Sequence, residues 1–286
     1  MKIQYWGTAA AEGIPGVFCG CGVCREAREK GGRYIRKRSQ VLLDDCLLVD
    51  FGSDTYSSSI QHGFDLSKLE HVFITHVHLD HFYPADLLMR KPGYAHANPY
   101  PTLVVHGSQD VEEYAFRDWQ MRGSADIMRK SGCVVFDTVK PYESREVCGF
   151  KVTALPATHG TPHPYVYIFE KEGKTLLLHN DSGYFKPEVM QWLKENNIKF
   201  DFVSYECTFA TRTATSETTG ETNHLGLPNI AEERARFIAN GNYKETTQES
   251  ITHFSHNTPT VGYGDMLKYA EECGYILAYD GLTVEF

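Results

Sequence analysis

The residues best suited to chemistry lie together in one short segment. Residues 76–81 read His-Val-His-Leu-Asp-His and offer three imidazoles and one carboxylate. Where such a segment leaves a strand in extended form, His76 and His78 project to the same side, and Asp80 and His81 follow on the next turn. Neutral imidazoles and a carboxylate suit zinc, iron or manganese. The segment therefore predicts a metal centre rather than a polar surface loop.

Three further polar residues share one sequence context. Each follows an apolar, strand-like run and precedes small residues that let the backbone pass closely. They are His159 in Ala-Thr-His-Gly, Asp181 in Asn-Asp-Ser-Gly and His253 in Thr-His-Phe-Ser. A lone histidine is usually structural, but three such residues accompany a strong anchor here. We expect them to complete the metal centre.

The order of these residues resembles that of the metallo-β-lactamase superfamily across essentially the whole chain. The resemblance implies an α/β (α+β) fold, namely a four-layer αββα sandwich of two mixed β-sheets flanked by helices. It places the site at one edge of the sheets. It also implies two metal ions with divided ligands: His76, His78 and His159 for one, Asp80, His81 and His253 for the other, and Asp181 as the bridge.

The same resemblance assigns supporting roles. Asp50, at the end of its strand, matches a buried aspartate that orients the ligand loop. Histidine rather than glutamate at position 78 favours a hydrolytic pair of zinc or manganese ions over a redox diiron centre. Two paired metals would supply a bridging hydroxide at neutral pH and stabilise the leaving oxygen. Asp80 is thus expected to be both a ligand and a catalytic residue in the hydrolysis of a phosphodiester, thioester or amide.

Two features point to the phosphodiesterase branch, which includes the transfer-RNA 3′-processing endonucleases. Thr252-His-Phe-Ser resembles the fifth motif of that branch. His224, in Asn-His-Leu-Gly-Leu-Pro, matches its extra histidine. We interpret His224 as a general acid for the leaving alcohol or as a contact to the phosphate. The plainer alternative is a surface histidine.

A cysteine cluster near the start of the chain suggests a separate metal. Cys19, Cys21 and Cys24 form a Cys-x-Cys-x-x-Cys pattern, which supplies three thiolates of a tetrahedral zinc site and lacks one ligand. In the cyclic-phosphate phosphodiesterases of phosphonate breakdown (the carbon–phosphorus lyase pathway), a similar cluster binds structural zinc. There, a histidine three residues after the fifth-motif histidine completes it, which here is His256. The resemblance implies a third, structural zinc; redox-active thiols are the alternative.

The elements that must position these residues follow from apolar periodicity and turn signals. We expect strands at 2–6, 39–43, 46–50, 72–75, 102–106, 134–137, 150–155, 165–169, 175–179, 200–206 and 249–254, and a closing hairpin of 276–279 with 283–286. We expect helices at 25–30, 110–129, 185–196, 230–240 and 260–273. Because no Gly-, Ser- or Pro-rich linker divides the chain, residues 1–286 are predicted to form a single domain. Residues 83–129 are a candidate lid or insertion, and 208–221 a mobile loop over the site.

The composition of the chain limits the kinds of molecule that we expect it to bind. The net charge of −9 argues against binding nucleic-acid polymers or anionic membranes through a broad basic surface. The sequence also has neither an apolar run long enough to span a membrane nor a secretory signal, so a cytoplasmic location is predicted. One basic cluster stands out as either a local anion pocket or a solvated helix end: Arg33, Arg36, Lys37 and Arg38.

The leading functional hypothesis is a metal-dependent phosphodiesterase that cleaves a small linear or cyclic phosphodiester. Water held between the metals would attack phosphorus, and His224 would help the alkoxide leave. An RNA-processing nuclease is the first alternative, disfavoured by the acidic charge and the lack of an obvious basic, glycine-rich tRNA-binding arm. A thioesterase or lactonase would not need His224. A non-catalytic carrier like the pyrroloquinoline quinone accessory proteins would typically lack part of the metal set. A homodimer is an open alternative to a monomer.

Overall fold

The computed structural model describes residues 1–215, 222–257 and 261–286, and these build two seven-stranded sheets. The strands of the first sheet are, in spatial order, β14 (Thr283–Glu285), β1 (Lys2–Gly7), β2 (Gln40–Leu43), β3 (Leu47–Val49), β4 (His71–Phe73), β5 (Leu103–Gly107) and β6 (Val134–Thr138). Those of the second are β13 (Ile276–Leu277), β12 (Tyr243–Thr252), β11 (Phe200–Glu206), β10 (Lys174–His179), β9 (Tyr165–Lys171), β8 (Phe150–Pro156) and β7 (Ser144–Val147).

Both sheets repeat one pairing scheme. In the first, β14, β1, β2 and β3 pair antiparallel, and β3, β4, β5 and β6 pair parallel. In the second, β7 to β10 pair antiparallel, and β10 to β13 pair parallel. Because neighbouring parallel strands end at the same edge of a sheet, the loops after β3, β4, β10, β11 and β12 can meet there.

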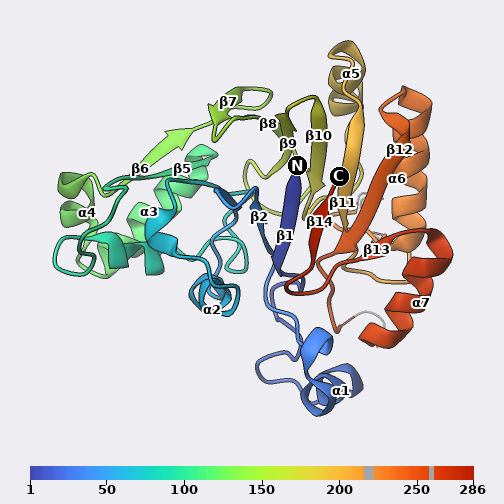
Figure 1. Ribbon diagram of the computed structural model, residues 1–286, viewed down its shortest axis with the longest axis horizontal. Helices are drawn as coiled ribbons and strands as arrows, with labels where there is room; N and C mark the ends of the chain where they lie inside the picture. Colours follow the sequence, from blue (N-terminus) through green and yellow to red (C-terminus); the bar gives the residue numbers. More distant parts are fainter. Residues whose placement is uncertain (216–221, 258–260) are drawn as a thin grey trace.

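Helices cover the outer faces of the two sheets. They are α1 (Gly22–Lys30), α2 (Thr55–Gln61), α3 (Gln109–Met121), α4 (Ala125–Ser131), α5 (Pro187–Glu195), α6 (Leu227–Asn240) and α7 (Tyr263–Cys273), with short 3₁₀ turns η1 (Gly32–Tyr34), η2 (Leu66–Lys68) and η3 (Asp86–Arg90). Figure 1 shows α3 and α4 on one flank of the molecule, α6 and α7 on the other, and α1 projecting from one end. None of the helices in the described ranges is long and apolar enough to span a bilayer.

Three apolar layers hold this arrangement together. The layer between the sheets includes Tyr5, Phe73 and Tyr167, and the Tyr167 hydroxyl donates a hydrogen bond to the Ile74 carbonyl at 2.8 Å. A second layer buries Trp119 of α3 against the outer face of the first sheet, and a third buries Phe237 of α6 against the second sheet. The four-layer αββα sandwich expected from the sequence is confirmed.

The helix predicted at 110–129 is wrong as a single element. Helix α3 ends at Met121 and α4 begins at Ala125. Between them Gly123 adopts a φ of 65°, a left-handed conformation that glycine reaches without a steric cost and that ends an α-helix. Strand β5 and helix α3 lie within the segment predicted as a lid or insertion, and α4 begins within it and ends at Ser131. Both helices pack on the first sheet. The lid role and the single-domain organisation stay predictions.

The closing hairpin is also wrong. The last two strands lie in different sheets, because β13 pairs with β12 and β14 pairs with β1. The chain crosses between them through residues 278–282. Ala278 N donates to the Ile251 carbonyl at 3.0 Å in the second sheet, and Gly281 N donates to the Tyr5 carbonyl at 2.7 Å in the first. The turn therefore joins the two sheets rather than two neighbouring strands.

Candidate metal centre and active site

Three of the predicted site residues share an unusual backbone conformation at strand ends. Asp50 follows β3, Asp181 lies two residues after β10, and His253 follows β12, with φ values of 69°, 42° and 59°. Left-handed backbone is uncommon for residues other than glycine, and where it persists the surrounding structure holds it in place. Strain of this kind clusters at functional sites, so these three turns mark one edge of the sandwich for closer description.

A first group of donor atoms forms around His78. Its Nδ1 lies 2.9 Å from His76 Nε2 and 3.1 Å from His159 Nε2. Oδ2 of Asp181 lies 3.5 Å from His76 Nε2 and 3.6 Å from His159 Nε2. The structure thus brings together four residues predicted from distant parts of the sequence.

A second group forms around Nε2 of His81. This nitrogen lies 3.3 Å from His253 Nε2, 3.2 Å from Asp80 Oδ2 and 3.2 Å from Asp181 Oδ2. The other carboxylate oxygen of Asp181, Oδ1, is 2.8 Å from His253 Nε2. The Asp181 carboxylate therefore faces both groups, which is the position expected of a bridging ligand.

The donor sets fit divalent metal ions. Tetrahedral zinc with nitrogen ligands at roughly 2.0–2.1 Å places neighbouring nitrogens about 3.3 Å apart. The nitrogen pairs here lie 2.9, 3.1 and 3.3 Å apart. The Asp80 and Asp181 carboxylates are 3% and 2% exposed, and buried carboxylates need compensating positive charge. Imidazole and carboxylate ligands suit zinc or manganese.

Paired charges dominate the electrostatics of this centre. Burial would lower the pKa of His253, but the charge of Asp181 and its hydrogen bond raise that pKa to about 10. Burial likewise opposes ionisation of Asp181, yet the facing imidazoles of His253 and His81 hold its pKa well below the usual range. The Asp181 carboxylate is therefore ionised, which is the form in which a carboxylate binds a metal ion.

Asp50 occupies the orienting position predicted for it. Its Oδ1 accepts hydrogen bonds from the Thr75 backbone nitrogen at 2.8 Å and the Thr75 hydroxyl at 2.9 Å, and its Oδ2 lies 2.6 Å from His81 Nδ1. This contact occupies Nδ1 and leaves Nε2 to face the second donor group. The neighbouring Gly52 lets the ligand loop approach, since a Cβ there would lie 2.1 Å from the Asp80 carbonyl oxygen.

His224 lies beside both donor groups. Its ring centroid is 4.9 Å from that of His159 and 6.0 Å from that of His253. Nδ1 lies 3.3 Å from the Thr208 hydroxyl and 3.7 Å from Glu206 Oε1, and 26% of the side chain is exposed. Burial would lower the pKa of His224, but the neighbouring Glu206 and Asp181 carboxylates raise it above the ordinary value. His224 is thus part of the centre, not an isolated surface histidine.

Sequence reasoning missed Glu206 and Thr208. Glu206 is fully buried, and its Oε2 accepts hydrogen bonds from the Thr208 backbone nitrogen at 2.9 Å and the Thr208 hydroxyl at 2.6 Å. That hydroxyl also lies 2.8 Å from His253 Nδ1. Glu206 is the last residue of β11, so it has the context of a polar residue at the end of an apolar strand. The rule that identified Asp181 would have found it.

The predicted fourth ligand of the cysteine cluster lies where it was expected. His256 Nδ1 is 3.6 Å from Cys19 Sγ and 3.8 Å from Cys21 Sγ, and Cys24 Sγ belongs to the same group of converging atoms. Tetrahedral zinc with one nitrogen and three sulfur ligands places sulfur and nitrogen about 3.6 Å apart. Gly16 makes room, since a Cβ there would lie 2.5 Å from His256 Nε2. The four residues fit a structural zinc.

A cleft of about 520 Å³ opens over the centre, within the range of small-molecule sites. His78, His224 and His253 line it, as do Ala10, Ala11, Glu12, Leu79, Asp80, Asp181, Thr208, Phe209, Ser255 and Asn257. Of the loop predicted to cover the site, Thr208 and Phe209 reach this cleft. Residues 216–221 of that loop lie outside the described residues.

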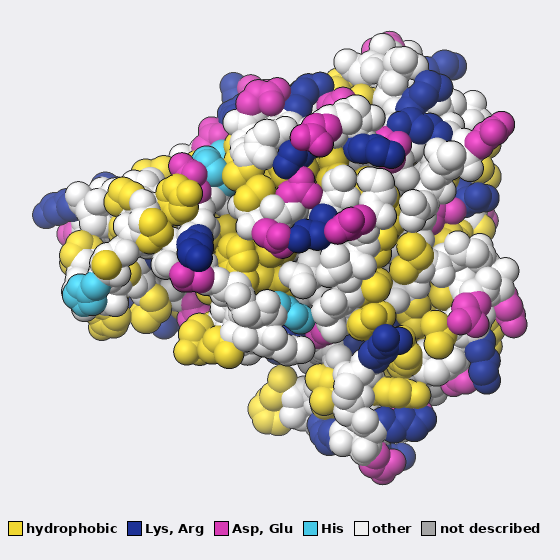
Figure 2. All heavy atoms as spheres, viewed as in Figure 1, with side chains coloured by type: hydrophobic (Ala, Val, Ile, Leu, Met, Phe, Trp, Pro, Cys, Tyr) yellow, Lys and Arg dark blue, Asp and Glu magenta, His cyan; other side chains and the backbone are white. Residues whose placement is uncertain are grey.

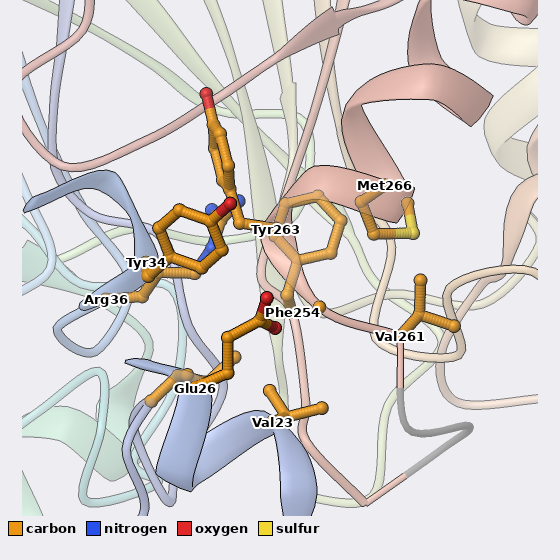
Figure 3. A pocket seen from close by; sticks show the side chains of 10 residues that line it. Val23, Glu26, Tyr34, Arg36, Phe254, Val261, Tyr263 and Met266 are labelled. Atoms are coloured by element: carbon orange, nitrogen blue, oxygen red, sulfur yellow. The ribbon is translucent and has the colours of Figure 1, made fainter. Parts of the chain in front are cut away.

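The four basic residues singled out as an anion pocket or helix end do not act together. Arg36 is 4% exposed, and its guanidinium lies over the Phe254 ring at 4.4 Å in a narrow pocket whose other aromatic residues include Tyr263 (Figure 3). Arg38 pairs with the Asp54 carboxylate at 3.0 Å, and Lys37 Nζ donates to Gln61. Arg33 stacks on Tyr279. Each cation has its own partner, so neither prediction describes the cluster.

Comparison with known proteins agrees with the geometry. The sequence model of the metallo-beta-lactamase superfamily matches residues 39–217, which is more than half of the 286 residues. The chain belongs to the metallo-β-lactamase superfamily. The resemblance predicted from the motifs is confirmed. Membership implies binding of divalent metal ions, and the donor groups of the structure fit that requirement.

Curated relatives within the superfamily include two proteins named ribonuclease Z. The one from Staphylococcus carnosus is 26% identical over 145 residues, 51% of this chain and 46% of that protein. The one from Listeria welshimeri is 26% identical over 159 residues, 54% of this chain and 49% of that protein. The chain thus spans about half the length of the curated relatives it matches.

Solved structures of the superfamily share the fold over the whole chain. Zinc-bound PqqB from Methylobacterium extorquens is 18% identical with a TM-score of 0.76, and the match covers 100% of both chains. A diphosphatase of the PhnP family is 19% identical with a TM-score of 0.71 and covers 100% of this chain and 96% of that one. The short form of human tRNase Z is 17% identical with a TM-score of 0.64, covering 100% and 99%. At these identities the likeness establishes the fold alone.

Proposed function

We propose that this protein is a phosphodiesterase that uses two divalent metal ions to cleave a small linear or cyclic phosphodiester. The observation that carries the proposal is His224, which lies against the donor groups at the floor of a cleft. Acyl-ester hydrolysis needs the metal ligands but not an additional proton donor at this position. A phosphodiester with an alkoxide leaving group does need one.

Each donor group would hold one ion, zinc or manganese, and together the two ions would supply a nucleophile from water and neutralise charge on the phosphoryl group. His76, His78 and His159 would bind the first, Asp80, His81 and His253 the second, and Asp181 both. Cys19, Cys21, Cys24 and His256 would hold a third, structural zinc that fixes the N-terminal loop.

Side chains of the protein would supply the proton that the leaving alkoxide needs. Nδ1 of His224 faces Glu206 and Thr208, which leaves Nε2 as the ring nitrogen available to substrate. Although burial lowers the pKa of His224, the neighbouring Glu206 and Asp181 carboxylates raise it above the ordinary value, which favours the protonated imidazole. His224 would then donate the Nε2 proton to the departing alkoxide oxygen, while the buried Glu206 carboxylate holds the ring in position.

An RNA-processing nuclease is the second candidate, favoured by the relatives named ribonuclease Z. The cleft lining supports a small substrate instead, because no lysine or arginine lines it in the described ranges. On the face seen in Figure 2, basic and acidic side chains are interspersed, and the net charge is −9. Polynucleotide binding draws most of its affinity from clustered cations. A nucleic-acid polymer and a membrane are therefore not among the proposed partners.

The remaining alternatives have weaker support. A thioesterase or lactonase would leave His224 and Glu206 without a role. A pyrroloquinoline quinone accessory-type carrier would not need the whole ligand set, and here all seven ligand positions converge. The proposal includes a cytoplasmic location, with a homodimer as the alternative to a monomer.

A panel of four substrate classes tests the proposed function. The metal-reconstituted protein is assayed on bis(p-nitrophenyl) phosphate, an acyl thioester, an acyl-homoserine lactone and a precursor transfer RNA. The proposal predicts the highest kcat/KM for the phosphodiester. Faster cleavage of the thioester or the lactone would overturn it, and faster cleavage of the precursor RNA would establish the nuclease.

A further inference from the structure

Among the described residues that line the cleft, one ionisable side chain belongs neither to the predicted metal ligands nor to the His224 pair. This is Glu12, on the loop that follows β1. The loop is anchored beside the end of β12, because Ala10 N donates to the Phe254 carbonyl at 3.0 Å. Glu12 is thus held at the rim of the active-site cleft by the same chain segment that carries His253 and His256.

One oxygen of Glu12 is occupied and the other is free among the described residues. Oε1 accepts hydrogen bonds from the Ser255 hydroxyl and from Asn257 Nδ2, the latter at 2.8 Å. Oε2 has no hydrogen-bond donor in the described part of the chain, and 26% of the side chain is exposed. A carboxylate fixed through one oxygen presents the other as an acceptor in a set direction. The partner it suits is a hydroxyl or amine that enters the cleft.

In the described part of the chain, the lining of this cleft offers no permanently charged cation for a second phosphate. Among the described residues none of its lining side chains is lysine or arginine. Residues 216–221 and 258–260, whose sequences are Ser-Glu-Thr-Thr-Gly-Glu and Thr-Pro-Thr, contain neither residue type. A second phosphate that lies beside the Glu12 carboxylate would meet a like charge, and no lysine or arginine among the described lining residues offsets it. Like charges brought close together select against such a ligand.

The rest of the wall is neutral. Ala10, Ala11, Leu79 and Phe209 line the cleft, and Leu79 is 62% exposed. Apolar side chains suit the flat or aliphatic part of an uncharged group, and the Glu12 carboxylate suits its hydroxyls. A substrate that fits this cleft therefore carries its charge only at the end that faces the metal ions.

We infer that Glu12 determines substrate specificity, and that the substrate class is a singly charged phosphodiester whose remaining part is a neutral, hydroxyl-bearing group such as a sugar or polyol. Glu12 Oε2 accepts a hydrogen bond from a hydroxyl of that group and disfavours substrates with a second phosphate. The inference rests on the proposed phosphodiesterase function.

The test compares two substrates that differ only in charge at the remote end. One is 2′,3′-cyclic AMP, with a free 5′-hydroxyl, and the other is the same cyclic nucleotide with a 5′-phosphate. The wild-type enzyme is expected to favour the first in kcat/KM by at least about tenfold, a ratio that corresponds to about 1.4 kcal/mol. Glu12→Gln is expected to reduce this ratio, and Glu12→Lys to reverse it.

The matched control is Glu29→Gln, which makes the same charge change on an exposed position of α1 and is expected to leave the ratio at the wild-type value. Zinc content is measured for every variant, because Glu12 Oε1 lies 3.9 Å from His256 Nε2. A variant that keeps its zinc and its folded circular dichroism spectrum reports on specificity rather than on structure.

Two outcomes overturn the inference in distinguishable ways. If wild-type protein cleaves bis(p-nitrophenyl) phosphate but treats the two cyclic nucleotides alike, or if the Glu12 variants keep the wild-type ratio, the role of Glu12 is wrong and the phosphodiesterase function stands. If no phosphodiester is cleaved at all, both the proposed function and the inference built on it fail.

Discussion

Asp50 Oδ2 lies 2.6 Å from His81 Nδ1, at the junction between the end of β3 and the ligand loop. The contact places the ring proton of His81 on Nδ1 and turns the lone pair of Nε2 toward Asp80 and Asp181. Because the other Asp50 oxygen is tied to Thr75, the carboxylate cannot easily rotate away. One buried aspartate thus fixes the tautomer of a predicted ligand.

Replacing this aspartate should weaken metal binding more than it weakens the fold. In Asp50→Asn the amide is a poorer acceptor for His81 Nδ1, so the ligand is less basic and less well oriented. We expect a loss of about 10–100-fold in affinity for the more weakly held active-site ion. Competition with a coloured chelator measures this affinity for the metal ion. Asp126→Asn, on an exposed position of α4, is the control, and equal affinities in the two variants would refute the role of Asp50.

The buried Glu206 should set the pH dependence of turnover through His224. The proposed proton donor must be protonated, so kcat falls as pH rises through the pKa of His224. Since the Glu206 carboxylate helps raise this pKa, Glu206→Gln should move the fall in kcat to lower pH. A pH–rate profile for 2′,3′-cyclic AMP tests this. An unshifted alkaline limb would mean that Glu206 does not act through His224.

Asp280 should make the free energy of unfolding depend on pH. Burial raises the pKa of Asp280 to about 6, although its carboxylate accepts hydrogen bonds from Thr8 and the Lys37 backbone. A raised pKa means that the folded chain binds this proton more tightly than the unfolded chain. Stability contributed by Asp280 is therefore full below about pH 4, declines up to about pH 6, and is absent above.

Urea unfolding at pH values from 4 to 7 measures this effect. The shift of about two pH units corresponds to at most about 3 kcal/mol. Asp280→Asn should lose this part of the slope, so wild type should become less stable relative to the variant as pH rises. A difference that stays constant across the range would contradict the raised pKa.

The cysteine cluster should bind metal independently of the active site. His256→Ala removes the proposed nitrogen ligand, so we expect the zinc content to fall by one ion and the melting temperature to drop while the active-site ions stay bound. Cys273→Ser, at an exposed cysteine outside the cluster, is the control. Metal analysis and calorimetry on the same samples decide the point, and full zinc content in His256→Ala would exclude this site.

Particular residues show why much of the site could be predicted. The ligand segment at 76–81 combines four donors at a spacing that few other roles require. Asp181 and His253 follow the parallel strands β10 and β12, which end at one edge. His159 follows β8, which runs in the same direction as β10 because both pair antiparallel with β9, so it reaches the same edge. Cys19, Cys21 and Cys24 lacked a ligand that only the family pattern supplied, and the structure places His256 beside them.

The features that could not be predicted depend on contacts distant in sequence. The short strands β13 and β14 look alike as a pattern, and only their pairing with β12 and with β1 assigns them to different sheets. Glu206 fits the strand-end pattern that identified Asp181, but only its contacts with Thr208 and His224 show what it does. Arg36 was grouped with its basic neighbours, but packing against Phe254 separates it from them.

The central claim is that His224 is a proton donor in a phosphodiesterase, and the leaving group tests it most directly. Wild-type, His224→Ala and, as a matched control, His96→Ala proteins are assayed on 2′,3′-cyclic AMP, which expels an alkoxide, and on bis(p-nitrophenyl) phosphate, whose leaving group needs no acid. We predict that His224→Ala lowers kcat by about 10²–10⁴-fold on the cyclic nucleotide and far less on the nitrophenyl ester. Equal losses on both substrates, or no hydrolysis of either by metal-loaded wild type, would contradict the account.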